Sequence, residues 1–100
     1  MRRATTPTHI FEFEIDPATI DKIRIAYAQN GKVILIKTKD ELTFTGNVGK
    51  VRLTQEETNL FNADEIVTIQ VRVLTTGGDA IASDEFKVYC SEVLDDEVMG

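Results

Sequence analysis

Hydrophobic and polar residues alternate along most of this chain, which is the pattern of half-buried β-strands. The alternation is clearest at residues 66–75, where Val67, Ile69, Val71 and Val73 face one way and polar residues mostly stand between them. This segment is predicted to be a central strand. Shorter runs predict further strands at residues 11–15, 22–27, 33–36, 42–45, 48–53, 80–82 and 86–90, the last two forming one strand or two.

Glycine-bearing pairs separate several of these runs. Asn30-Gly31, Gly46-Asn47 and Gly77-Gly78 each lie between segments rich in Val, Ile, Thr and aromatic residues. Such pairs tolerate the positive φ angles that primed hairpin turns require. Each pair therefore predicts two adjacent antiparallel strands.

The first hairpin has a definite predicted register. With residues 30 and 31 as the loop, Tyr27 lies opposite Ile34 and Arg24 lies opposite Lys37. Two like charges directly across a ladder are mildly unfavourable. The pair is therefore expected either to be exposed near a carboxylate or to meet an acidic partner.

The second hairpin places Phe44 opposite Gly49. An aromatic ring lying across a cross-strand glycine fills the space of the missing side chain. A β-bulge at Gly49 is the alternative.

A short helical turn is predicted near residues 55–61. Thr54 followed three residues later by Glu57 fits a capping box at a helix start. Leu60 and Phe61 are expected to close the end of the core. The turn then carries the chain from one sheet to the other, as crossovers in β-sandwiches do.

These elements predict an all-β fold, namely an immunoglobulin-like antiparallel β-sandwich of about seven strands with that one helical turn. A chain of 100 residues suits a single domain. We expect one domain over residues 1–92, with a flexible lead at residues 1–8 and an acidic tail at residues 93–100.

The charge of the chain is concentrated near its end. The formal net charge is −6, and residues 92–97 supply four carboxylates and no base, which leaves −2 for the rest. Such a tail stays solvated or docks on a basic partner. Nucleic acid is not an expected partner, since its binding draws on an excess of Lys and Arg.

The single cysteine, Cys90, excludes an intramolecular disulfide and favours a reducing compartment. The first residues lack the apolar region of a signal peptide, and no run approaches the roughly 20 apolar residues of a membrane helix. We therefore expect synthesis in a cytoplasm, with no membrane partner.

Catalytic chemistry is not indicated. His9 is the only histidine, and the alternation turns Cys90 toward the core, so the two do not form a nucleophile pair. One Cys and one His cannot close a zinc site, and the carboxylates at residues 95–97 lack the spacing of a calcium loop. The expectation is a protein without catalytic, cofactor or metal residues.

Several segments carry a resemblance to a known group. They read TPTHIF at residues 6–11, IRIAYAQNGK at 23–32, LTQEET at 53–58, IQVRV at 69–73 and GDA at 78–80. In these the chain resembles small structural proteins encoded by phages and prophages of Gram-positive bacteria. It is more distantly similar to the N-terminal β-sandwich module of phage baseplate upper proteins. The resemblance implies a virion-associated structural or adaptor module made in the host cytoplasm, with no catalytic residues.

The expected function is therefore protein–protein contact with other virion proteins or with copies of the same chain, including a homo-oligomer. Candidate contact residues are Arg24, Arg52, Arg72 and Tyr89 on outward faces, and Val93, Leu94, Val98 and Met99 in the tail, which is suited to extend a neighbour's sheet. One alternative is a phage-encoded inhibitor of a host protein. A second is a carbohydrate-binding module, although the chain has no tryptophan and only two tyrosines.

Overall fold

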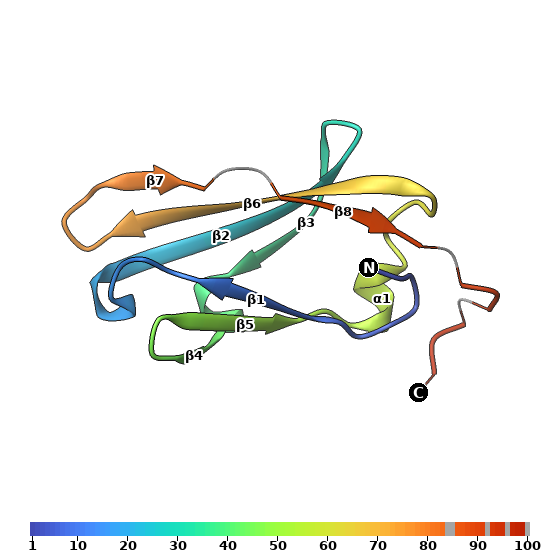
Figure 1. The fold of residues 1–100 in the computed structure, drawn as a ribbon, viewed down its shortest axis with the longest axis horizontal. Helices are drawn as coiled ribbons and strands as arrows, with labels where there is room; N and C mark the ends of the chain where they lie inside the picture. Colours follow the sequence, from blue (N-terminus) through green and yellow to red (C-terminus); the bar gives the residue numbers. More distant parts are fainter. Residues whose placement is uncertain (84–85, 92, 96, 100) are drawn as a thin grey trace.

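Two antiparallel β-sheets pack face to face in the computed structural model, which describes residues 1–83, 86–91, 93–95 and 97–99, with 86–88 described by their backbone alone (Figure 1). The strands are β1 (Thr8–Glu12), β2 (Ile20–Gln29), β3 (Lys32–Thr38), β4 (Thr43–Thr45), β5 (Val48–Arg52), β6 (Glu65–Thr75), β7 (Ala80–Ala82) and β8 (Phe86–Cys90). Short helices are η1 (Pro17–Thr19), η2 (Lys39–Glu41) and α1 (Gln55–Thr58). An all-β sandwich with a single α-helix in the described residues is thus confirmed.

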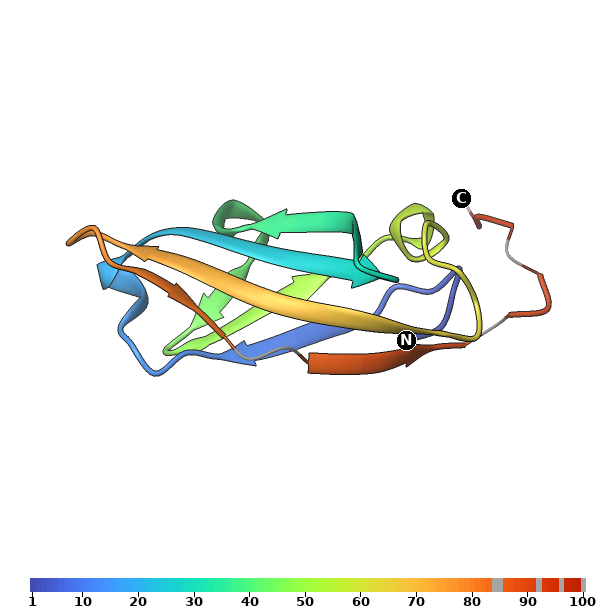
Figure 2. The ribbon, with the colours of Figure 1, turned by 90° about the horizontal axis from the view of Figure 1, so that it is seen from above.

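The larger sheet has the order β3-β2-β6-β7, and β8 also pairs with β6; the smaller sheet has the order β1-β5-β4. β6 runs along the molecule between β2 on one side and β7 and β8 on the other (Figure 2). Its central position is as predicted, and Val67, Ile69 and Val71 are buried. The described residues form eight strands against about seven expected, because the last run divides into β7 and β8.

The core lies between the two sheets. Its buried apolar residues are Phe13, Ile20, Ile23, Ile25, Tyr27, Val51, Leu53, Phe61, Val67, Ile69, Val71 and Cys90. Cys90 is fully buried and Tyr89 exposed, as the alternation predicts. The inward direction predicted for Phe86 and Val88 concerns side chains outside the described set.

The first hairpin turns at Asn30 and Gly31, whose φ angles are 52° and 74°, and Gln29 pairs with Lys32 as predicted. Beyond the turn the predicted register is wrong. Tyr27 pairs with Leu35 because a β-bulge makes Ile34 an extra residue on β3. The prediction assumed an unbroken ladder, whereas the bulge lets both Ile34 and Leu35 pack against the core.

The bulge also corrects the predicted Arg24–Lys37 pair. Arg24 lies opposite Thr38 on one side and Arg72 on the other. Lys37 points inward and is only 7% exposed. Its Nζ lies 2.6 Å from Glu57 Oε2 and 3.0 Å from Glu41 Oε2. Burial opposes the charge, but hydrogen bonds and attraction to these carboxylates raise the pKa of Lys37 above its ordinary value.

The predicted capping box is confirmed. The Glu57 backbone N–H donates to Thr54 Oγ1 at 3.2 Å, and the Thr54 N–H donates to Glu57 Oε1 at 2.8 Å. Burial disfavours the charged form of Glu57, but hydrogen bonds from Lys37 and Thr54 outweigh it and hold the pKa of this carboxyl below its ordinary value. One carboxylate thus caps α1 and fixes it to the larger sheet.

Only one of the two residues expected to close the core does so. Phe61 is buried, whereas Leu60 is 57% exposed. The helix ends at Thr58, and the turn that follows it directs Leu60 to solvent and Phe61 inward.

In the smaller sheet, Phe44 pairs with Gly49 as predicted, and the loop is the pair Gly46-Asn47. A Cβ atom at Gly49 would lie 3.1 Å from the rings of Phe13 and Phe44 and 3.2 Å from Leu42 Cδ2. The aromatic rings therefore occupy the space that a side chain would need.

The third hairpin joins β6 to β7 as predicted, through residues 76–79 rather than two residues alone, with Gly78 at a φ of +91°. After β7, the Ser83 N–H donates to Val71 O at 2.8 Å, and Ser83 Oγ accepts from the Val71 N–H at 2.9 Å. Ser83 therefore closes β7 against β6.

Residues 1–8, predicted as a flexible lead, lie against β8 and α1. The Met1 ammonium donates to Tyr89 O at 2.9 Å, and the Ser91 N–H donates to Met1 O at 2.7 Å. The Thr5 N–H donates to Thr58 Oγ1 at 3.1 Å. Hydrogen bonds thus attach this segment to one end of the sandwich.

Replacing Gly49 by valine is expected to destabilise the protein by about 1–3 kcal/mol, because the new methyl groups must displace two packed rings. Urea unfolding measures the change. The adjacent outward-facing substitution Lys50→Val is the control, expected within about 0.5 kcal/mol of the unsubstituted protein. Equal stability of the two variants would contradict the close packing at Gly49.

Replacing Glu57 by glutamine is expected to cost about 1–3 kcal/mol of unfolding free energy, because Lys37 then keeps only Glu41 as a charged partner. The matched control is Glu56→Gln, an exposed neighbour on the same helix that takes no part in the cap. Chemical denaturation of both variants checks this. A Glu56→Gln loss as large as that of Glu57→Gln would count against the ion pair.

Candidate protein-binding interface

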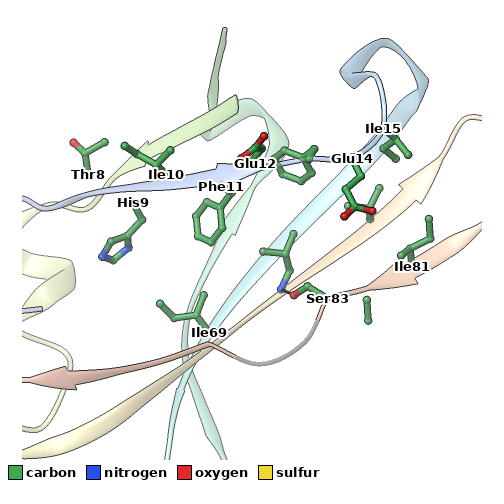
Figure 3. A pocket seen from close by; sticks show the side chains of 14 residues that line it. Thr8, His9, Ile10, Phe11, Glu12, Glu14, Ile15, Ile69, Ile81 and Ser83 are labelled. Atoms are coloured by element: carbon green, nitrogen blue, oxygen red, sulfur yellow. Dashed lines mark hydrogen bonds between the residues drawn. The ribbon is translucent and has the colours of Figure 1, made fainter. Parts of the chain in front are cut away.

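An open groove runs between the free edge of β1 and the strands β6 and β7. We call it the edge groove; its volume is about 970 Å³. Its apolar lining consists of Phe11, Phe13 and Ile15 from β1 and the residues after it, Ile69, Val71 and Val73 from β6, and Ile81 and Ala82 from β7. In Figure 3, His9 and Phe11 point from β1 toward Ile69, whereas Thr8 and Ile10 point away.

The outer edge of β1 offers backbone groups to a further strand. In the ladder with β5, Leu53 N–H donates to Pro7 O at 3.0 Å and Phe13 N–H donates to Asn47 O at 2.9 Å. Backbone groups alternate in direction along an antiparallel strand. Those of Thr8, Ile10 and Glu12 therefore face away from β5.

The edge of β7 has the same property on the opposite side of the groove. Thr75 N–H donates to Asp79 O, and Ser83 N–H donates to Val71 O, each at 2.8 Å. By the same alternation, the backbone groups of Ala80 and Ala82 face away from β6. Among the described residues, two unpaired strand edges thus flank an apolar groove.

Acidic and exposed apolar side chains mark the rim of the groove. Glu12 and Glu14 are both exposed and line it. Ile10 is 63% exposed on the outer side of β1, and Ile81 is 49% exposed within the groove. The surface is therefore apolar at its floor and negative along the β1 side.

His9 joins the two sheets at one end of the groove. Its Nδ1 lies 2.7 Å from the hydroxyl of the buried Tyr27, and the two rings are stacked with centroids 5.5 Å apart. Tyr27 in turn meets Phe61 edge to face, with centroids 6.1 Å apart. Burial, with a smaller effect of the positive N-terminus, lowers the pKa of His9. Burial and the nearby Glu57 raise the pKa of Tyr27, so its hydroxyl stays protonated and can donate to His9 Nδ1 in the imidazole tautomer that carries its proton on Nε2.

The contact residues predicted from sequence fall into separate places. Arg24 and Arg72 are exposed cross-strand neighbours on the outer face of the larger sheet. Tyr89 is 50% exposed, and its hydroxyl donates to Asp64 Oδ1 at 2.8 Å, a bond that raises the pKa of Tyr89.

Arg52 and two tail residues come together at the α1 end. Arg52 donates to Thr6 Oγ1 at 3.1 Å and, with Val98 and Met99, lines a smaller hollow of about 410 Å³. The Met99 N–H donates to Gln55 Oε1 at 2.8 Å, and Gln55 Nε2 donates to Met99 O at 2.9 Å. The tail therefore folds back on α1.

The first half of the tail is different. Val93 is half-buried, while Leu94 is fully exposed. None of the eight predicted contact residues lines the edge groove. One residue in the sequence could have indicated the groove. Ile10 is apolar, yet it stands at one of the alternating positions, with Thr8 and Glu12, that face outward.

Within the described part of the chain, no group of three or more His, Cys, Asp or Glu residues is arranged to hold a metal ion. The described helices also include none that is long and apolar enough to span a membrane. No protein-family model, curated protein or solved structure matched the chain in the three comparisons made.

Acidification is expected to destabilise the fold through His9 before the carboxylates take part. The unfolded imidazole gains a proton near pH 6.5, whereas the buried one resists protonation. The free energy of unfolding should thus fall as the pH drops from 6.5 through the lowered folded-state pKa.

Urea unfolding at about pH 7.5 and about pH 5.5 measures this loss. In His9→Gln, whose amide oxygen still accepts from Tyr27, the loss is expected to shrink. An unchanged loss in that variant would assign the pH dependence to other groups.

Proposed function

We propose that this protein is a non-enzymatic structural or adaptor module of a phage virion, which binds an extended segment of another virion protein by strand addition in the edge groove. The observation that carries the proposal is the pairing of two free strand edges with an apolar groove between them. The virion context rests on the sequence resemblance to small phage and prophage structural proteins.

Strand addition uses both features of the groove. Main-chain hydrogen bonds to an open edge supply affinity, and side chains at alternate positions enter apolar spaces. The backbone groups of Thr8, Ile10 and Glu12 provide the ladder, and Val71, Val73 and Ile81 provide the apolar surface. The bound segment is therefore extended, with apolar residues at every second position.

Charge further restricts the kind of segment that can bind in the groove. Glu12 and Glu14 lie along the β1 side of the groove, so a bound segment carrying Lys or Arg opposite them is favoured. The chain's own tail carries carboxylates and no base and is disfavoured in this groove. The occupant is thus a basic-apolar segment of a different protein.

A small inhibitor of a host protein would use the same groove, and the two roles differ in where the chain is found. Mass spectrometry of purified particles is expected to detect the chain in stoichiometric amounts. Absence from particles, together with expression early in infection, would contradict the virion role and favour the inhibitor.

Substitution then tests the groove itself. Ile81→Glu places a charge on the apolar floor and is expected to lower incorporation into particles about tenfold or more, as a lost anchor residue does. The matched control is Ile66→Glu, since Ile66 is 48% exposed against 49% for Ile81 but lies outside the groove. Equal incorporation of both folded variants would overturn strand addition at this edge.

A further inference from the structure

A basic patch stands on the outer face of the larger sheet. Arg24 and Arg72 are directly opposite each other on β2 and β6, and both are exposed. Like charges in this position repel each other. Among the described residues, neither guanidinium forms an ion pair with a carboxylate.

The two sides of the patch differ. On the β3 side, Thr38 lies opposite Arg24 and is hydrogen-bonded to the carboxylates of Asp40 and Glu41. Lys22, two residues before Arg24, is also exposed. The outward positions of β2 from Lys22 to Ala28 and of β6 from Ile66 to Leu74 carry no carboxylate. Ala82 lies opposite Arg72 on β7, so only a methyl group flanks the guanidinium there. As far as the described residues show, the β6 side of the patch is therefore open to an incoming anionic group.

The acidic tail offers such a group and is anchored at two described residues. Ser91 forms an isolated parallel β-bridge with Arg2, and Met99 forms two hydrogen bonds with the side chain of Gln55. Between these anchors, Asp95 and Glu97 are exposed, and Leu94 is fully exposed. A segment fixed at both ends loses less conformational entropy on binding than a free tail does.

The tail and the patch lie in different regions of one molecule. The tail lies at the α1 end of a molecule 46 Å long, whereas β6 runs away from that end toward Arg72 (Figure 1). A contact between the tail of one copy and the patch of another therefore joins two different surfaces. Such a contact is heterologous and builds rings or rows rather than a closed two-fold dimer.

We propose that the acidic segment around Asp95 and Glu97 of one copy docks on the Arg24–Arg72 patch of a second copy and assembles the protein head to tail. The charge complementarity is internal to the chain, since its tail is acidic without bases and, among the described residues, the two arginines of the patch form no ion pair. This surface is separate from the edge groove and leaves it free for its partner.

The test exchanges the charges. The patch variant Arg24→Glu/Arg72→Glu and the tail variant Asp95→Lys/Glu97→Lys are each expected to be monomeric by light scattering, while the unsubstituted chain forms higher-mass species. An equimolar mixture of the two variants is expected to regain that mass. In the mixture, the acidic tail of the patch variant meets the basic patch of the tail variant, and the basic tail of the tail variant meets the acidic patch of the patch variant. The assembly should weaken between about 0.05 M and about 0.5 M salt, where screening removes exposed attractions.

Two control variants distinguish the head-to-tail contact from effects of charge elsewhere and from the edge groove. Lys32→Glu/Lys50→Glu reverses two exposed bases outside the patch and is expected to assemble normally. Ile81→Glu, which tests the edge groove, is also expected to assemble, so the two proposals fail independently. A monomeric unsubstituted chain, assembly by either charge variant alone, or no recovery on mixing would overturn the head-to-tail contact.

Discussion

The carboxylate of Glu57 is the contact on which the arrangement of the two sheets depends. One oxygen accepts from the Thr54 N–H and caps α1, while the other pairs with the buried ammonium of Lys37. Lys37 faces inward only because the bulge at Ile34 shifts the register of β3. With α1 held in this way, Phe61 enters the core against Tyr27, whose hydroxyl meets His9 of β1. A single chain of polar and aromatic contacts thus connects the crossover to the edge of the opposite sheet.

The edge groove follows from the unequal widths of the sheets. Three strands in the smaller sheet pack against a larger sheet in which β6 pairs with both β7 and β8 on its outer side. The smaller sheet ends at β1, so apolar side chains of β6 and β7 remain open beside it. Surfaces of this kind are where sandwiches accept additional strands. The groove is therefore a consequence of the architecture as well as the basis of the proposed function.

Charge is distributed so that each surface favours a different partner. Glu12 and Glu14 make one side of the groove negative, while Arg24 and Arg72 make the outer face of the larger sheet positive. The acidic tail is repelled by the first surface and attracted by the second. The proposed self-association and the proposed partner binding would thus use separate surfaces, as a module that repeats within an assembly and also contacts a second component requires.

The sequence by itself determined those features of the fold that depend on residues close together in the chain. The turn at Asn30-Gly31, the capping box at Thr54 and the pairing of Phe44 with Gly49 are all local, since each depends on backbone conformation or on residues a few positions apart. Alternation also placed β6 at the centre and Cys90 inside. Contacts between distant segments were decided only by the tertiary structure. The β3 bulge forms because Ile34 and Leu35 both find space against the core, and it carries Lys37 to a carboxylate twenty residues away. The Arg24–Arg72 pair and the edge groove depend on which strands become neighbours, and the alternation within any one strand does not contain that information.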